Sequence, residues 1–166
     1  GVKVYSDIGK CFDGDSVIVT VPLSIIKKGL ITFEPPLPKE KVEAANNLFM
    51  RSGGKVFVKF KKNFWGAELG TIYLDSFVKI WSAPGHLLPI EKNKVLSGYL
   101  IDKECDELYN QPVETQKETI FRDLEKIWGE TVRELYEDHY IVNWGANKYI
   151  QGAYSCPLLP GETAHK

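Results

Sequence analysis

The chain has little cysteine and no pattern that would tie its cysteines together. Three cysteines occur among the 166 residues, widely spaced and without a C-x-x-C, namely Cys11, Cys105 and Cys156. An odd number of separated thiols does not make a disulfide framework, so we expect reduced cysteines in an intracellular, cytoplasmic protein. The histidines also lack the spacing of metal ligands, and we expect no metal site.

Neither a block of one charge sign nor a long apolar run is present. The 21 Lys and Arg residues are balanced by 22 Asp and Glu residues, which gives a net charge of -1. Nucleic-acid binders gain affinity from clustered cations, so we expect no nucleic-acid partner. No apolar run reaches the roughly 18 residues of a membrane-spanning helix. The first residues lack the charged and apolar regions of a signal peptide, and we expect none.

Hydrophobic and turn-forming residues alternate in a way that predicts a mixed fold. We expect strands at residues 2–6, 17–21, 30–33, 55–60, 71–74, 77–82, 95–101 and 140–144. We expect helices at residues 23–28, 38–49, 103–109 and 114–128, with Gly129 ending the last of them. The fold class is therefore α+β, with a mixed or antiparallel sheet flanked by helices.

Two parts of the predicted fold, the N-terminal hairpin and the break before residue 55, each depend on one short sequence feature. Residues 17–21 are a continuous β-branched run, typical of a strand buried on both faces. The first 22 residues would then form a β-hairpin closed by a loop that contains Cys11 and Phe12. Residues 52–54, Ser-Gly-Gly, are expected to break the chain before the strand at 55–60.

The C-terminal region contains an unusual group of aromatic residues. Trp144, Tyr149 and Tyr154 surround the small residues Gly152 and Ala153, and prolines follow. Small residues let a flat group approach the backbone, and Trp and Tyr offer planar faces with a polar tip. These features favour a pocket for a flat ligand, although the same aromatics would also suit an ordinary core.

The spacing of this region resembles the flavin-dependent amine oxidases, which include monoamine oxidases, polyamine oxidases and lysine-specific histone demethylases. Their pattern W-x(7)-G-x-Y-[ST] with a later P-G turn corresponds to Trp144, Gly152, Tyr154, Ser155 and Pro160-Gly161. Residues 17–38, 55–65 and 121–129 resemble further segments of the same family, in the same order. The four blocks together cover nearly the whole chain.

The resemblance also implies how the chain is divided. The family's phosphate-binding G-x-G-x-x-G turn does not occur in these 166 residues, and neither does its late flavin-contacting segment. The resemblance therefore implies a central piece of a longer protein. Residues 1–22 would be a strand pair of the FAD-binding domain, residues 23–150 the substrate-binding domain, and residues 151–166 a return toward the FAD-binding domain.

The resemblance assigns chemistry to three residues. Lys55 matches a lysine that contacts flavin N5 through a water, and Trp144 and Tyr154 match aromatics at the flavin. Tyr154 would also form one wall of a cage for the substrate amine. The reaction implied is oxidation of an amine to an imine, with O2 reduced to H2O2. Ala153 stands where monoamine oxidases carry a flavin-linked cysteine, so we expect non-covalent FAD in the full-length protein, and neither FAD nor turnover in these residues alone.

Other candidates have an equally simple structural reading. Phe64, Trp65 and Trp81 would either line a substrate pocket or fill the core, and we include Trp81 as a substrate-binding candidate. Three carboxylates would either meet a polyamine or lie on an ordinary surface, namely Asp75, Asp102 and Glu104.

Two alternative functions remain open at this stage. One is a non-catalytic binding module that keeps the substrate-domain fold, which the joint presence of a lysine and two matching aromatics disfavours. The other is an L-amino acid oxidase, which would need an arginine to pair the substrate carboxylate. Arg51 is expected in a loop and Arg122 and Arg133 near helices, so an amine is the favoured substrate.

Overall fold

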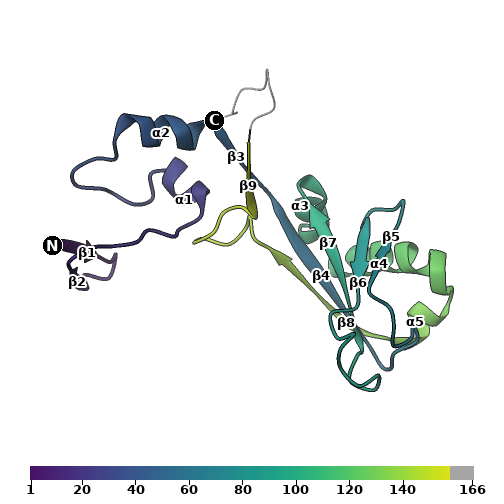
Figure 1. The fold of residues 1–166 in the computed structure, drawn as a ribbon. Coiled ribbons are helices and arrows are strands. Elements are labelled where there is room, and N and C mark those ends of the chain that lie inside the picture. The colour runs from purple at the N-terminus through teal and green to yellow at the C-terminus, as the bar shows by residue number, and fades with distance from the viewer. Residues whose placement is uncertain (158–166) are drawn as a thin grey trace.

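A five-stranded antiparallel sheet is the centre of the molecule (Figure 1). The computed structural model describes residues 1–157. In spatial order the strands are β5 (Thr71–Tyr73), β6 (Ile80–Ser82), β7 (Val95–Ile101), β4 (Gly53–Phe60) and β8 (Tyr136–Asn143). The central strand β4 pairs with β7 on one side and β8 on the other, so segments far apart in the sequence meet along it.

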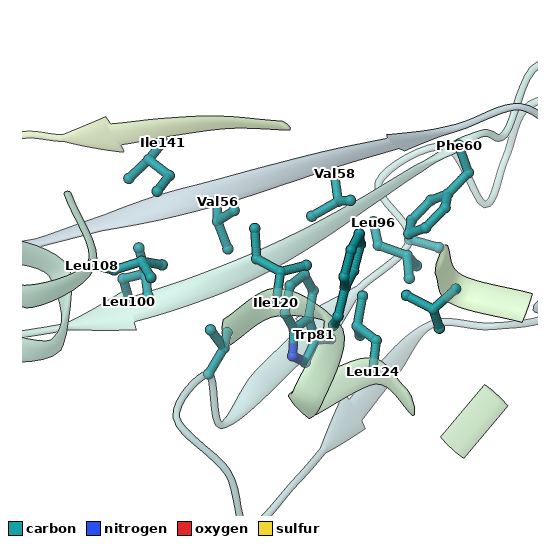
Figure 2. Close-up of a cluster of buried hydrophobic side chains, with 14 of the residues drawn as sticks. Val56, Val58, Phe60, Trp81, Leu96, Leu100, Leu108, Ile120, Leu124 and Ile141 are labelled. Atoms are coloured by element: carbon teal, nitrogen blue, oxygen red, sulfur yellow. The ribbon is translucent and has the colours of Figure 1, made fainter. Parts of the chain in front are cut away.

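Three helices cover one face of this sheet and close the core against it (Figure 2). They are α3 (Lys103–Tyr109), α4 (Val113–Trp128) and α5 (Thr131–Leu135). Alternate residues of β4, Val56, Val58 and Phe60, are fully buried under them. This follows from the period of two along a strand, which sends alternate side chains to opposite faces.

Glycines let the layers of this core approach closely. A Cβ at Gly98 would lie 2.7 Å from Val56 Cγ1 and 3.1 Å from the Trp81 ring, so the glycine makes room for the buried indole. A Cβ at Gly54 would lie 1.8 Å from the Val142 carbonyl oxygen and 2.7 Å from the sulfur of Cys105 on α3. Both positions therefore require glycine because of space.

The N-terminal residues form an extended arm that projects away from the five-stranded sheet (Figure 1). Its elements are β1 (Val2–Tyr5), β2 (Cys11–Gly14), α1 (Leu23–Lys27) and α2 (Lys39–Asn46). The strands β1 and β2 pair with each other, and Pro38 precedes the first turn of α2. Ser24 and Ile25 are the arm's buried residues, and α1 is joined to the C-terminal loop by a hydrogen bond from Ser24 Oγ to the carbonyl of Ile150.

A two-stranded ribbon connects the arm to the sheet. β3 (Leu48–Arg51) pairs with β9 (Tyr154–Pro157), and β3 runs into β4 with Ser52 between them. The motif residues Pro160-Gly161 and most of the expected return segment 151–166 lie outside the described residues.

The α+β class and the antiparallel sheet are confirmed. The predicted strands at 55–60, 71–74 and 95–101 and the helices near 23–28, 103–109 and 114–128 are present, and Gly129 ends α4 with φ 57°. The helix predicted at 38–49 ends early, since β3 takes its last residues into pairing with β9.

Four other expectations are wrong, and a fifth, the last strand, is present with different bounds. Residues 17–21 and 30–33 form no strand, because within the described residues no other strand pairs with them. The first hairpin closes earlier than expected, since Cys11–Gly14 is itself the second strand. The pair Gly53-Gly54 does not break the chain but begins β4. The strand expected at 140–144 begins already at Tyr136 and ends at Asn143.

Candidate functional site

The face of the sheet opposite the helices carries the first candidate residue. Lys55 is exposed there, directly between Tyr99 on β7 and Val142 on β8. The same face is open at both edges, where Tyr73 is 76% exposed and Tyr140 is 69% exposed. Lys55 therefore stands on an uncovered surface with aromatic side chains beside it.

Gly53 brings the other two candidates to Lys55. The backbone N–H of Trp144 donates to the Gly53 carbonyl at 3.2 Å. A Cβ at Gly53 would lie 3.1 Å from Ala153 Cβ and 3.4 Å from Cε1 of the Tyr154 ring. Because Gly53 and Lys55 are alternate residues of one strand, they share a face. Lys55, the backbone of Trp144 and the ring of Tyr154 therefore all lie near Gly53, a position that has no side chain.

The loop after β8 is held by side chains and by its own backbone. Asn143 Nδ2 donates to Asp106 Oδ1 at 2.8 Å, and Asn143 Oδ1 accepts the N–H groups of Gly145 at 2.8 Å and Ala146 at 3.3 Å. The N–H of Gly152 donates a hydrogen bond to the Trp144 carbonyl at 3.3 Å, which closes the loop. These bonds fix where Trp144 leaves the sheet, and its side chain remains 41% exposed.

The end of this loop packs tightly against β3. A Cβ at Gly152 would lie 2.4 Å from Met50 Cγ, so any side chain there would have to displace Met50. The next residue, Ala153, donates its N–H to the Arg51 carbonyl at 2.8 Å. Tyr154 then enters β9 directly opposite Arg51. The small residues of the aromatic region therefore serve to seat Tyr154 on the ribbon.

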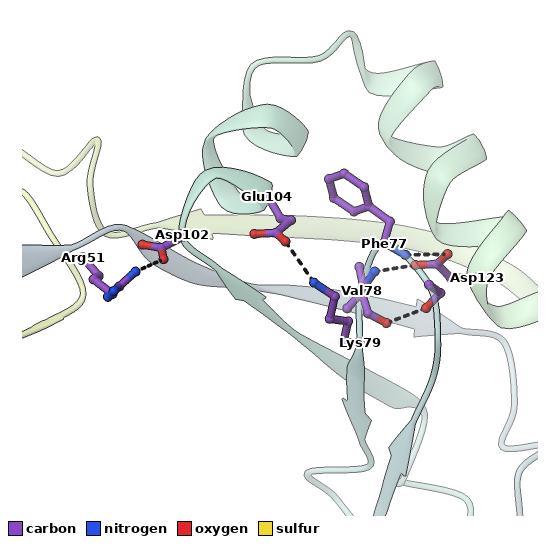
Figure 3. Close-up of polar contacts among 8 residues, drawn as sticks. Arg51, Phe77, Val78, Lys79, Asp102, Glu104 and Asp123 are labelled. Atoms are coloured by element: carbon purple, nitrogen blue, oxygen red, sulfur yellow. Dashed lines mark hydrogen bonds and ion pairs between the residues drawn. The ribbon is translucent and has the colours of Figure 1, made fainter. Parts of the chain in front are cut away.

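Arg51 belongs to the site, although the sequence placed it in a loop. It is the last residue of β3, and its Nη1 lies 2.5 Å from Asp102 Oδ2 (Figure 3). Asp102 has φ 51° and ψ -131°, a conformation that costs a non-glycine residue roughly 1–3 kcal/mol. Both residues line a shallow groove together with Ser52, Lys79, Ile101, Lys103, Glu104 and Asp106.

The electrostatics of the site favour a neutral phenol at Tyr154. Partial burial raises the pKa of Tyr154 above its ordinary value, and the nearby Tyr99 and Asp102 raise it further. The Arg51 guanidinium, beside the Asp102 carboxylate, has a pKa above its ordinary value. Arg51 is thus a permanent cation with a carboxylate partner, and Tyr154 offers an uncharged ring beside it.

Trp81 does not belong to this site. It lies opposite Gly98 on the helix-covered face of the sheet and is 0% exposed (Figure 2). Its expected role in substrate binding is corrected, because the side chain fills the core. Phe64 and Trp65 also pack on the core, in edge-to-face contact with each other and with Phe60.

The remaining candidates are surface groups or structural thiols. Asp75 is exposed, and Glu104 forms an ion pair with Lys79 at 3.1 Å (Figure 3). All three cysteines are free, and burial raises the pKa of the Cys105 thiol to about 11. In residues 1–157 no group of His, Cys, Asp and Glu could hold a metal ion, and no helix is long and apolar enough to cross a membrane.

Sequence reasoning missed three parts of the site: Gly53, Tyr99 and the Arg51–Asp102 pair. The adjacent glycines in front of Lys55 were the available signal, since glycine within a strand marks a close approach of another chain segment. Tyr99 could be found only from the register of β4 and β7. The ion pair depends on the β3–β9 ribbon, which joins residues distant in the sequence.

Comparison with known proteins gives a family match over nearly the whole chain. The family described as flavin containing amine oxidoreductase matches residues 1–165. Polyamine oxidase 2 of Arabidopsis thaliana is 31% identical over 96% of this chain and 32% of its own length. Lysine-specific histone demethylase 1 homolog 1 of the same plant is 45% identical over 93% of this chain and 19% of its own length.

A bovine relative and a solved structure extend the comparison. The peroxisomal N(1)-acetyl-spermine/spermidine oxidase of Bos taurus is 27% identical over 93% of this chain. A structure of wild-type putrescine oxidase bound to putrescine shares the fold, with a TM-score of 0.77 at 21% identity over 93% of this chain. The chain spans 33% of the bovine enzyme and 34% of the putrescine oxidase chain. The chain belongs to the flavin containing amine oxidoreductase family.

Proposed function

We propose that these residues form the substrate-side part of an FAD-dependent amine oxidase. One observation carries the proposal: the exposed Lys55, the backbone of Trp144 and the ring of Tyr154 come from distant parts of the sequence and all lie near Gly53. In the proposed reaction the α-carbon of the amine loses a hydride equivalent and gives an imine, which water hydrolyses. Two electrons and two protons reach O2 and form H2O2.

The residues on this face fit the flavin end of FAD. The exposed Lys55 offers a positive charge, and the partly exposed Trp144 offers a flat apolar surface, beside a strand position without a side chain. When bound beside these residues, FAD would supply the electron acceptor that oxidation of the amine requires. We propose that binding is non-covalent, since Ala153 offers no thiol beside Tyr154.

Each proposed residue has a separate task. Lys55 holds a water and places positive charge where negative charge develops. Tyr154 presents a neutral ring to the substrate amine, which is attracted by the negative face of the ring. Trp144 supplies the apolar wall that keeps bulk water from this region.

The division of the chain remains part of the proposal. Residues 1–22 and 151–166 would belong with the FAD-binding domain and residues 23–150 with the substrate-binding domain. The exposed apolar run at Val17, Ile18 and Val19 supports the first boundary, because such runs are typical of strands buried between neighbours. Since no G-x-G-x-x-G occurs here, we propose that these residues alone neither hold FAD nor turn over. The three free, widely spaced cysteines support the proposal that the longer protein is intracellular.

Arg51 gives the amino acid oxidase alternative a specific observation in its favour. An arginine beside Tyr154 could pair a substrate carboxylate through two parallel hydrogen bonds. Arg51 already forms an ion pair with the Asp102 carboxylate and is therefore not free to bind a substrate carboxylate. An amine thus remains the better substrate.

An absorbance spectrum of the full-length protein that carries these residues tests the proposal. We expect the visible bands of a bound flavin, bleached by anaerobic addition of putrescine and restored by air together with H2O2. A full-length protein without flavin bands would contradict the proposal. A flavin that an amine cannot bleach but an L-amino acid can would favour the alternative.

A further inference from the structure

Two cations, Arg51 and Lys55, lie on either side of Tyr154 along the consecutive strands β3 and β4. Arg51, Gly53 and Lys55 are alternate residues where β3 runs into β4, and the Tyr154 ring lies over Gly53 in the middle. Tyr154 is also the direct cross-strand partner of Arg51. An amine beside this ring would therefore be a cation close to a second, permanent cation, which is unfavourable unless the charge of Arg51 is compensated.

Asp102 compensates the charge of Arg51, although its own backbone adopts an unfavourable conformation for a non-glycine residue. Its φ of 51° suits glycine better than aspartate, and its side chain makes no capping hydrogen bond to α3. The contact that its carboxylate does make is the ion pair with Arg51, at 2.5 Å, between side chains that are 41% and 35% exposed. A half-exposed pair of this kind contributes little to folding, so stability alone does not explain an aspartate here.

We propose that Asp102 is a specificity-determining residue of the amine site. By neutralising Arg51, it lets an ammonium group occupy the surface beside Tyr154 and prevents the guanidinium from recruiting a carboxylate. The inference rests on the proposed function, because it assumes that the substrate binds at Tyr154. It adds which substrates are rejected, namely amines that carry a carboxylate, and which residue rejects them.

The test compares two probes of equal length in the full-length, FAD-loaded protein. Putrescine carries an ammonium group at each end, whereas 4-aminobutyrate replaces one of them by a carboxylate. We expect Asp102→Gly to raise the KM for putrescine about tenfold, because the substrate ammonium would then meet the unpaired charge of Arg51. The factor corresponds to repulsion in a medium whose dielectric constant lies between those of water and the protein interior. The same variant should show a larger rise in melting temperature when 4-aminobutyrate is added, which reports binding without turnover.

A double variant separates this role from a structural one. Arg51→Gln combined with Asp102→Gly removes both charges, so the KM for putrescine should return close to the wild-type value. The melting temperature without ligand should stay within a few degrees for Asp102→Gly, because glycine suits the backbone at this position. Glu118→Gln is the matched control: it removes a carboxylate that also pairs with an arginine, Arg133, but lies outside this groove, and it should leave the KM unchanged.

Two failures can be told apart. If the wild-type protein bleaches with no amine, the proposed function fails and this inference falls with it. If wild-type turnover of putrescine is normal but Asp102→Gly has the same KM, only the inference is overturned. It is also overturned if the double variant stays as impaired as the single one, because the loss would then come from the backbone rather than from a free Arg51.

Discussion

Large hydrophobic residues are buried in the five-stranded sheet but exposed in the N-terminal arm. In the sheet, Val56, Val58 and Phe60 are fully buried under three helices. In the arm, Ile18 is 88% exposed and Phe12 is 58% exposed, although both are large hydrophobic residues. The sheet therefore has its own core, whereas the arm exposes apolar side chains that its own elements do not cover.

The difference shows what a local pattern can and cannot specify. An apolar run forms a stable strand only where neighbours bury it, since burial of one Val or Ile side chain contributes about 1.5–3 kcal/mol. Residues 95–101 have such neighbours on both sides, in β4 and β6. Residues 17–21 have none among the described residues and stay unpaired. The arm is thus the part of the chain whose structure depends most on a covering surface.

The largest expected effect is the loss of a core side chain. Trp81→Ala should lower the free energy of unfolding by about 3–5 kcal/mol, because it leaves a cavity under the helices. Ile18→Ala should change it by less than about 0.5 kcal/mol in these residues, because the side chain is already in water. Urea unfolding of both variants measures the difference. A similar loss for both would show that the arm is buried after all.

A substitution that adds one methyl group should have the next largest effect. Gly54→Ala should cost about 3 kcal/mol, because its Cβ meets the Val142 carbonyl and Cys105 on α3. Gly70→Ala is the matched control, since no atom lies within 4 Å of its added Cβ. Thermal unfolding of the two variants provides the comparison. Equal melting temperatures would mean that β8 and α3 do not pack against Gly54 as described.

A smaller effect is expected where a helix is tied to the sheet by polar bonds. The buried Asp123 of α4 accepts the N–H of Val78 at 2.7 Å and that of Phe77 at 3.3 Å (Figure 3). Asp123→Ala leaves both donors without this partner and should cost about 1–3 kcal/mol in urea unfolding. A free energy of unfolding equal to that of the wild type would show that water replaces these bonds.

The same carboxylate gives a pH dependence with a defined sign. Burial raises the pKa of Asp123 above its ordinary value of 3.8, so the folded protein binds this proton more tightly than the unfolded chain. Its contribution to stability is therefore greatest below pH 3.8 and is lost as the pH rises through the raised pKa. In urea unfolding at several pH values, Asp123→Asn should remove this contribution to the change of the unfolding free energy with pH. The same pH dependence in the variant and the wild type would contradict the raised pKa.

The sheet was predictable from the sequence because its signals are local. Alternation in residues 55–60 and the apolar face around Ile120 and Leu124 specify a strand and a helix without knowledge of their partners. The ribbon of β3 and β9 was not predictable in this way. Its pairing of Arg51 with Tyr154 is set by a register between distant segments, and no short window of sequence contains that information.

The site was predicted in part for the same reason. The resemblance to the amine oxidases selected Lys55, Trp144 and Tyr154, and in the structure Lys55, the backbone of Trp144 and the ring of Tyr154 lie near Gly53. Spacing could not tell which aromatics face the open side of the sheet, and so Trp81 was wrongly included. The face of Trp81 depends on its register against Gly98, which only the paired strands define.

The central claim is that Lys55 acts at the flavin whereas other lysines of the same face do not. Lys59 is the matched control: it lies on the same strand and face, is exposed, and pairs with Glu137 at 2.5 Å. Stopped-flow rates of flavin reduction by putrescine and of reoxidation by O2 should be compared in the full-length protein. We predict that Lys55→Met slows at least one step by about tenfold or more, and that Lys59→Met slows neither. Wild-type rates for both steps in Lys55→Met would contradict the account.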